Sequence, residues 1–171
     1  MKHTLLFLLM ICACTLQATA TGKQPRLTDD ELMTLVQKQT FRYFWDFAHP
    51  ESGLARERSN DRLEIATIGG SGFGVMAIIV GVERGFITRE QGAERLLKIV
   101  EFLNKADSYH GIWAHWMDGA TGKTIPFSRK DDGADLVESA FMFEGLLAAH
   151  QYFTHDNPTE NRIRGLINTL W

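Results

Sequence analysis

Apolar and polar residues follow one another along the chain with the spacing of helices rather than strands. Two segments, 28–47 and 88–103, open with threonine and carry Glu or Gln three residues later, which is the pattern of a capping box. Their apolar residues then recur every three or four positions, as in an amphipathic helix. Helices are also predicted at 71–84, at 132–153 and from 158 onward, and no segment shows a convincing strand. The pattern predicts an all-α protein built from helical hairpins with long loops.

The predicted helix at 71–84 is apolar on nearly every side, so we expect it to be buried all round and to end at Gly85. The glycine-rich run before it, 69–74, does not fit a phosphate-binding loop, because neither a preceding strand nor a Gly-Lys-Ser/Thr sequence is present. It predicts close helix packing and a turn. The apolar pattern of the last helix is still running at Trp171. We therefore expect residues 27–171 to form the N-terminal part of a larger domain, truncated at the C-terminus.

The first twenty residues, 1–20, have the order of a secretory signal peptide. A basic residue precedes an apolar run, 5–16, that is too short to span a bilayer, and small residues at 18–20 offer a cleavage site. This order predicts a periplasmic or secreted protein with no membrane span. Cys14 also gives a poor match to a lipoprotein box, so a lipid anchor there stays open as an alternative. Both cysteines, Cys12 and Cys14, fall in the leader, which leaves the mature chain without a disulfide.

The acidic segment 131–138 is the sharpest chemical signal. On a helix that starts near Asp132, the side chains of Asp131, Asp135 and Glu138 share one face, at i, i+4 and i+7. An N-cap at Asp132 and the helix dipole also account for Asp131 and Asp135, so a catalytic and a structural role both stay open for these two. Glu138 lies past the expected first turn among apolar residues, where a carboxylate is costly unless it is paired or useful. Surroundings that disfavour its ionised form suit a general acid, which makes Glu138 the first catalytic candidate.

The loop 107–130 is long and rich in aromatic residues, and loops of that length in compact domains are usually functional or disordered. Flat aromatic faces suit the apolar faces of sugar rings. The candidate substrate-binding residues are Trp113, His115, Trp116 and Phe127. The alternative is a loop folded onto the core by its own aromatics. His110 and His115 have no suitably spaced third ligand, so we expect no metal and no cofactor. The net charge of −3 includes no basic excess, which argues against a nucleic acid partner.

Several short motifs occur together along the chain. They are 39–45 (QTFRYFW), 70–74 (GSGFG), 81–85 (GVERG), His115-Trp116, 121–123 (TGK) and 131–138. In combination they resemble the bacterial glycoamylase-like domain family, and in particular the β-1,2-glucan hydrolases of glycoside hydrolase family 144. The resemblance runs from about residue 27 to the end. It implies an (α/α)6 toroid of inner and outer helices with a pocket at one end that holds Asp131, Asp135 and Glu138. The chain departs from the family by stopping less than halfway round the ring.

These features together predict a glycoside hydrolase that acts on an extracytoplasmic glucan, with β-1,2-glucan favoured, by acid–base catalysis with inversion. Its partner would be an oligo- or polysaccharide substrate, and we expect the complete parent to be a monomer and this chain alone to be inactive. An inverting acid and base lie about 6.5–9.5 Å apart. Asp131 with Glu138, or a carboxylate beyond residue 171, fits that spacing better than Asp135 with Glu138. A secreted glycan-binding domain without activity and a polysaccharide lyase are the alternatives.

Overall fold

The computed structural model describes residues 26–60 and 62–170. The expected leader, 1–20, with the alternative lipid anchor at Cys14, lies outside the described residues and stays a prediction. The chain divides into two units that meet between Thr34 and Leu35, inside one helix.

The first unit contributes the start of helix α2 (Asp29–Trp45). The Thr28 hydroxyl accepts a hydrogen bond from the Glu31 N–H at 3.3 Å, and the Glu31 carboxylate accepts one from the Thr28 N–H at 2.8 Å. These two bonds satisfy N–H groups that have no partner inside the helix. The predicted capping box is therefore confirmed.

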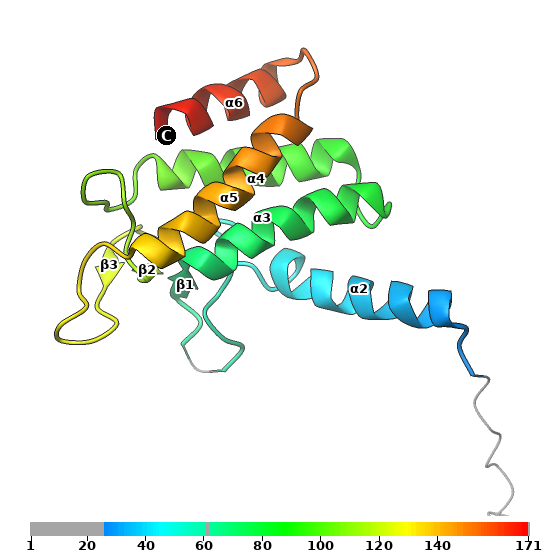
Figure 1. Ribbon diagram of the computed structural model, residues 1–171, viewed down its shortest axis with the longest axis horizontal. Coiled ribbons are helices and arrows are strands. Elements are labelled where there is room, and N and C mark those ends of the chain that lie inside the picture. Colours follow the sequence, from blue (N-terminus) through cyan, green and yellow to red (C-terminus); the bar gives the residue numbers. More distant parts are fainter. Residues whose placement is uncertain (1–25, 61, 171) are drawn as a thin grey trace, which may run out of the picture. The chain divides into compact units, whose positions relative to one another are not determined.

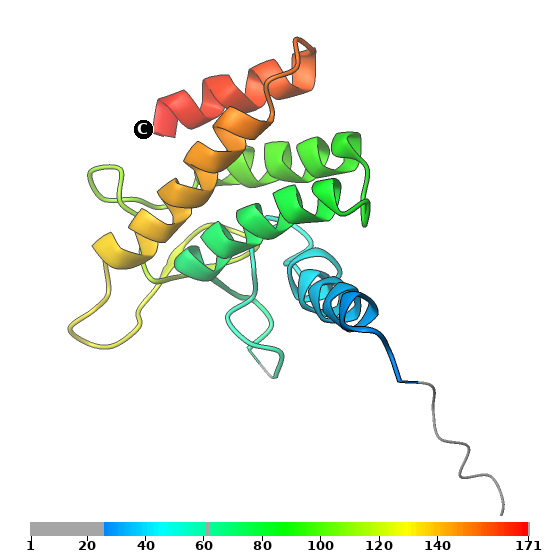
Figure 2. The ribbon, with the colours of Figure 1, turned by 45° about the vertical axis from the view of Figure 1, so that its right-hand side comes forward.

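The second unit contains the rest of α2, further helices and a small antiparallel sheet (Figures 1 and 2). The helices are α3 (Ile68–Glu83), α4 (Arg89–Leu103), α5 (Leu136–Tyr152) and α6 (Pro158–Leu170). The strands are β1 (Ile65–Thr67), β2 (Trp116–Asp118) and β3 (Thr124–Ile125), paired in the order β1-β2-β3. The mainly helical prediction is confirmed. The expectation of no strand is wrong, because strands of two or three residues are too short to show an alternating pattern.

The sheet lies at the end of the helices where α3 and α5 begin (Figure 1). Strand β1 leads directly into α3, since Thr67 is both its last residue and the N-cap of the helix. Strand β2 pairs with β1, with Thr67 opposite Trp116. The aromatic loop 107–130 is therefore not free of regular structure. It carries a hairpin that is held against the starts of the two helices.

Helices α3 and α5 cross at two glycines. A Cβ on Gly72 would lie 2.2 Å from the carbonyl oxygen of Phe141, and a Cβ on Gly145 would lie 2.5 Å from the carbonyl oxygen of Gly72. The two backbones are thus in direct contact at this point, which no side chain would permit. The close packing predicted from the glycine-rich run is confirmed. The predicted turn is wrong, because α3 begins at Ile68 and includes Gly69 in its first turn.

Helix α3 is not buried all round among the described residues. Phe73 is 56% exposed, and Met76 and Val80 are exposed as well. On α5, Phe141 is also exposed, and its ring lies 5.2 Å from that of Phe73. The interior of the unit is formed by the other faces of these helices and by α4, with Val75, Leu96, Val100, Met142 and Leu146 fully buried. No helix among the described residues is both long and apolar enough to cross a membrane.

A buried ion pair joins the start of α4 to the start of α6. The predicted capping box of Thr88 and Gln91 at the start of α4 is confirmed, as is Gly85 after the end of α3, with a φ of 66°. Arg89, the first residue of α4, donates to the two carboxylate oxygens of Glu160 at 2.9 Å each. The Glu160 side chain is only 3% exposed. Burial alone would raise its pKa, but hydrogen bonds from Arg89, the His155 N–H and Asn157 lower the pKa to about 2.

We expect Gly72→Ala to lower the free energy of unfolding by about 1–3 kcal/mol, because the new methyl group would overlap backbone atoms of α5. Gly165→Ala, in α6, is the matched control, since nothing lies within 4 Å of a Cβ at that position. It should stabilise the protein by about 0.5–1 kcal/mol through helix propensity. Chemical denaturation followed by circular dichroism measures both. Equal effects of the two substitutions would contradict the close crossing.

The ionised Glu160 should make stability depend on acid. Its pKa falls from 4.5 in the unfolded chain to about 2 in the fold, so its contribution is complete above pH 4.5 and is lost as the pH falls towards 2. The difference corresponds to about 3 kcal/mol. Glu160→Gln should lower stability at pH 7 and remove much of the slope between pH 5 and 2, measured by denaturation at each pH. An unchanged slope in the variant would show that other carboxylates cause the acid sensitivity.

Candidate active site

Asp135 starts helix α5. Its Oδ1 accepts hydrogen bonds from the backbone N–H groups of Val137 and Glu138, at 2.9 and 3.0 Å. The predicted cap at Asp132 is therefore wrong, and Asp131 lies in the loop before the helix rather than on it. The argument that three acids share one helix face also fails. The sequence has Asp at both 132 and 135, and only the tertiary contacts of Asp135 make it the cap.

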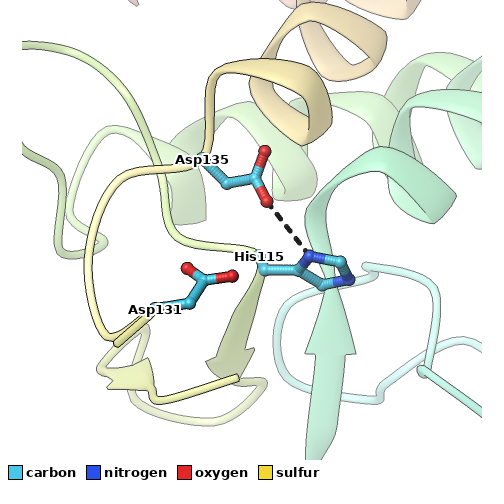
Figure 3. Close-up of side chains that lie close together, drawn as sticks. All are labelled: His115, Asp131 and Asp135. Atoms are coloured by element: carbon cyan, nitrogen blue, oxygen red, sulfur yellow. Dashed lines mark hydrogen bonds and ion pairs between the residues drawn. The ribbon is translucent and has the colours of Figure 1, made fainter. Parts of the chain in front are cut away.

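His115 meets Asp135 from the strand side (Figure 3). Its Nδ1 lies 3.1 Å from Oδ2 of Asp135. The backbone fixes this approach, because the Asp135 N–H donates to the carbonyl of Trp113 and the Ile68 N–H donates to the carbonyl of His115. The residue before β2 is thus tied both to the start of α5 and to the start of α3.

Glu138 points towards the N-terminus of α3. Its Oε2 accepts hydrogen bonds from the Gly69 N–H at 2.9 Å and from the Thr67 hydroxyl at 3.4 Å. A helix N-terminus favours a negative charge. A Cβ on Gly69 would lie 2.5 Å from the same oxygen, so glycine leaves the space that the carboxylate fills. The expectation of apolar surroundings for Glu138 is therefore wrong, since its partners are polar and its Oε1 lies 4.0 Å from Nε2 of His115.

The acids and the histidine form one compact group. One possible metal-ligand atom from each of His115, Asp131 and Asp135, a ring nitrogen or a carboxylate oxygen, lies within 4.8 Å of the other two (Figure 3). The sequence argument that His115 lacks further ligands nearby is therefore wrong, although the expectation of no metal stays a prediction. Burial disfavours the charged form of Asp135, but hydrogen bonds from the Glu138 N–H, His115 and the Val137 N–H outweigh it. They hold the pKa of Asp135 below its usual value, so this carboxylate is ionised at neutral pH.

The aromatic candidates for substrate binding differ in exposure. The Phe127 ring is 47% exposed and lies 4.3 Å from the ring of His115 and 4.8 Å from that of Trp116. The Trp116 side chain is 9% exposed, with the guanidinium of Arg62 5.8 Å from its ring. Phe127 and the imidazole of His115 are thus the surfaces that a sugar ring could contact in this part of the chain.

Trp113 belongs to the core instead. It is 1% exposed, and its ring lies 5.0 Å from that of Phe143. The alternative of a loop folded onto the core therefore holds for this residue. Conversely, sequence reasoning did not identify Thr67 and Gly69 as partners of Glu138. The glycine-rich run was the available signal, and it indicated packing but not the carboxylate that occupies the space.

The chain is similar to proteins named for action on β-1,2-linked glucans. No family model matches it. It is 53% identical, over 146 residues, to the exo β-1,2-glucooligosaccharide sophorohydrolase (non-reducing end) of Parabacteroides distasonis, an alignment that covers 85% of this chain and 20% of that protein. The endo-β-1,2-glucanase of Chitinophaga pinensis, solved with sophorotriose and glucose, is 52% identical with a TM-score of 0.83 and covers 85% of this chain and 37% of that one. The predicted resemblance is confirmed.

A second solved structure extends the likeness. A protein described as a candidate glucoamylase from Bacteroides uniformis is 83% identical with a TM-score of 0.85, over 86% of this chain and 36% of that one. The chain thus spans about a fifth of the curated relative and little more than a third of these two structures. The described helices and sheet correspond to one part of each of these larger proteins.

Proposed function

We propose that this chain forms part of the active site of a glycoside hydrolase that acts on β-1,2-glucan, within a larger (α/α) toroid. The observation that carries the proposal is the group of Asp131, Asp135 and Glu138 around His115 at the joined starts of α3 and α5. Its support is the 52–53% identity of the same segment to proteins named as β-1,2-glucan hydrolases. The substrate is an oligo- or polysaccharide of glucose, and no cofactor takes part.

The contacts of the acids suggest different roles. Both oxygens of Asp135 accept hydrogen bonds inside the protein, so this residue orients its neighbours. Glu138 uses Oε2 for its contacts with Gly69 and Thr67, and among the described residues the donor that faces its Oε1 is the imidazole of His115, at 4.0 Å. We assign proton transfer at the glycosidic bond to Oε1 of Glu138.

The spacing of the carboxylates limits the choice of a second catalytic group. Donor atoms of Asp131 and Asp135 lie within 4.8 Å, which is shorter than the roughly 6.5–9.5 Å of an inverting pair. Asp135 is hydrogen-bonded to one nitrogen of the His115 imidazole and Glu138 faces the other at 4.0 Å, so the ring separates the two carboxylates. With inversion, we propose that Asp131 and Asp135 are not the acid–base pair with each other, and that Glu138 works with a carboxylate at the longer spacing.

We expect Glu138→Gln to lower turnover of β-1,2-glucan by about 10²- to 10⁴-fold in the complete gene product, because glutamine keeps the acceptor for Gly69 but cannot transfer a proton. Glu144→Gln, an exposed position on the same helix, is the matched control and should keep normal turnover. Release of reducing sugar is the measurement, with nuclear magnetic resonance of the first product to identify its anomer. Inversion gives the α-anomer first.

Other outcomes would support the alternatives. Normal turnover by Glu138→Gln would make this residue structural. A product with a new ultraviolet-absorbing double bond would indicate a lyase. Binding of the glucan without any product, by the unmutated protein, would indicate a glycan-binding domain.

We also propose that the protein is exported, on the basis of the order of residues in 1–20. We expect a mature N-terminus at Thr21, measured by mass spectrometry of the protein from the cell envelope or the medium. A lipid-modified N-terminus at Cys14 would replace cleavage after Ala20 with an anchor, and an intact Met1 would contradict export by this leader.

A further inference from the structure

We propose that His115 is a positioning residue for Glu138, with Asp135 holding a proton on Nδ1 so that, in the neutral ring, Nε2 carries no proton and faces Oε1 of Glu138. The catalytic part of this inference rests on the proposed function. The tautomer of His115 does not, because it follows from the hydrogen bond between Nδ1 and Asp135.

The first step is the tautomer of the imidazole. Asp135 is ionised, and an ionised carboxylate can only accept hydrogen bonds. At 3.1 Å from Oδ2 of Asp135, Nδ1 of His115 must therefore be the donor. The second oxygen of Asp135 is held by two backbone N–H groups, so the carboxylate cannot turn away without uncapping α5.

The second step is the proton on the other side of the ring. Nε2 of His115 faces Oε1 of Glu138 at 4.0 Å. The other oxygen, Oε2, already accepts from the Gly69 N–H and the Thr67 hydroxyl, so a proton on Glu138 belongs on Oε1. Because Asp135 holds the proton of the neutral ring on Nδ1, Nε2 faces Oε1 as an acceptor and not as a donor.

The third step is the rigidity of the imidazole. The ring of His115 lies 4.3 Å from that of Phe127 and 5.7 Å from that of Trp116, and the backbone carbonyl of His115 accepts a hydrogen bond from the Ile68 N–H. The charged groups around it come from three parts of the chain. They are Asp135 and Glu138 at the start of α5, Asp131 in the loop before it, and Glu57, itself next to Arg58 and Arg62, in the loop before β1.

A test without activity measures the tautomer directly. In the ¹⁵N spectrum of the labelled complete gene product, assigned by loss of the signal in His115→Gln, we expect His115 to carry its proton on Nδ1 when neutral. Asp135→Asn, which keeps a capping oxygen, should increase the Nε2–H form. A neutral His115 with its proton on Nε2 would overturn the proposal.

A kinetic test examines the catalytic part. His115→Gln should displace the limb of the kcat/KM pH profile that Glu138→Gln abolishes, because it removes the ring that faces Oε1. His150→Gln, at the far end of α5, is the matched control and should leave the profile unchanged. A profile of unchanged shape in His115→Gln, merely scaled down, would make His115 only structural. Normal activity in Glu138→Gln would contradict the proposed function while leaving the tautomer result valid.

Discussion

The backbone contact between α3 and α5 determines where the candidate site can form. Gly72 and Gly145 allow the two helices to touch, and the same approach brings the first turn of α5 to the first turn of α3. Glu138 on one helix can then accept a hydrogen bond from Gly69 on the other. A wider crossing would separate this carboxylate from its partners, so a packing requirement in the middle of two helices also decides the geometry at their ends.

The features that sequence reasoning predicted well are local ones. The capping boxes at Thr28 and Thr88 depend on residues three positions apart, and Gly85 supplies the backbone conformation that ends α3. The strands could not be predicted in this way, because each is too short to carry a pattern and exists only through pairing with distant residues. The prediction that α3 is buried all round failed for a similar reason, since Phe73 is as apolar as a core residue but is exposed among the described residues.

Sequence reasoning identified residues of the candidate site but not their arrangement. Asp131, Asp135, Glu138 and His115 do lie together, yet the shared helix face that suggested the acids does not exist. The N-cap is Asp135 and not Asp132, three residues earlier, as the sequence had suggested. Asp135 is selected by its contacts with His115 and with the carbonyl of Trp113, which lie 20 and 22 residues away in the chain. Trp113 shows the same limit, because an aromatic residue that suits a sugar equally suits a core.

The helix N-terminus at Glu138 gives the carboxylate two unlike oxygens. Backbone N–H groups at such a position commonly bind an anion from solution. Here the protein supplies its own anion, and Oε2 of Glu138 occupies the Gly69 N–H. Oε1 is thereby held in a fixed direction, and it faces Nε2 of His115, the nitrogen that is not hydrogen-bonded to Asp135. A neutral sugar offers little charge with which to orient a catalytic group, so the orientation must be built into the protein before the substrate arrives.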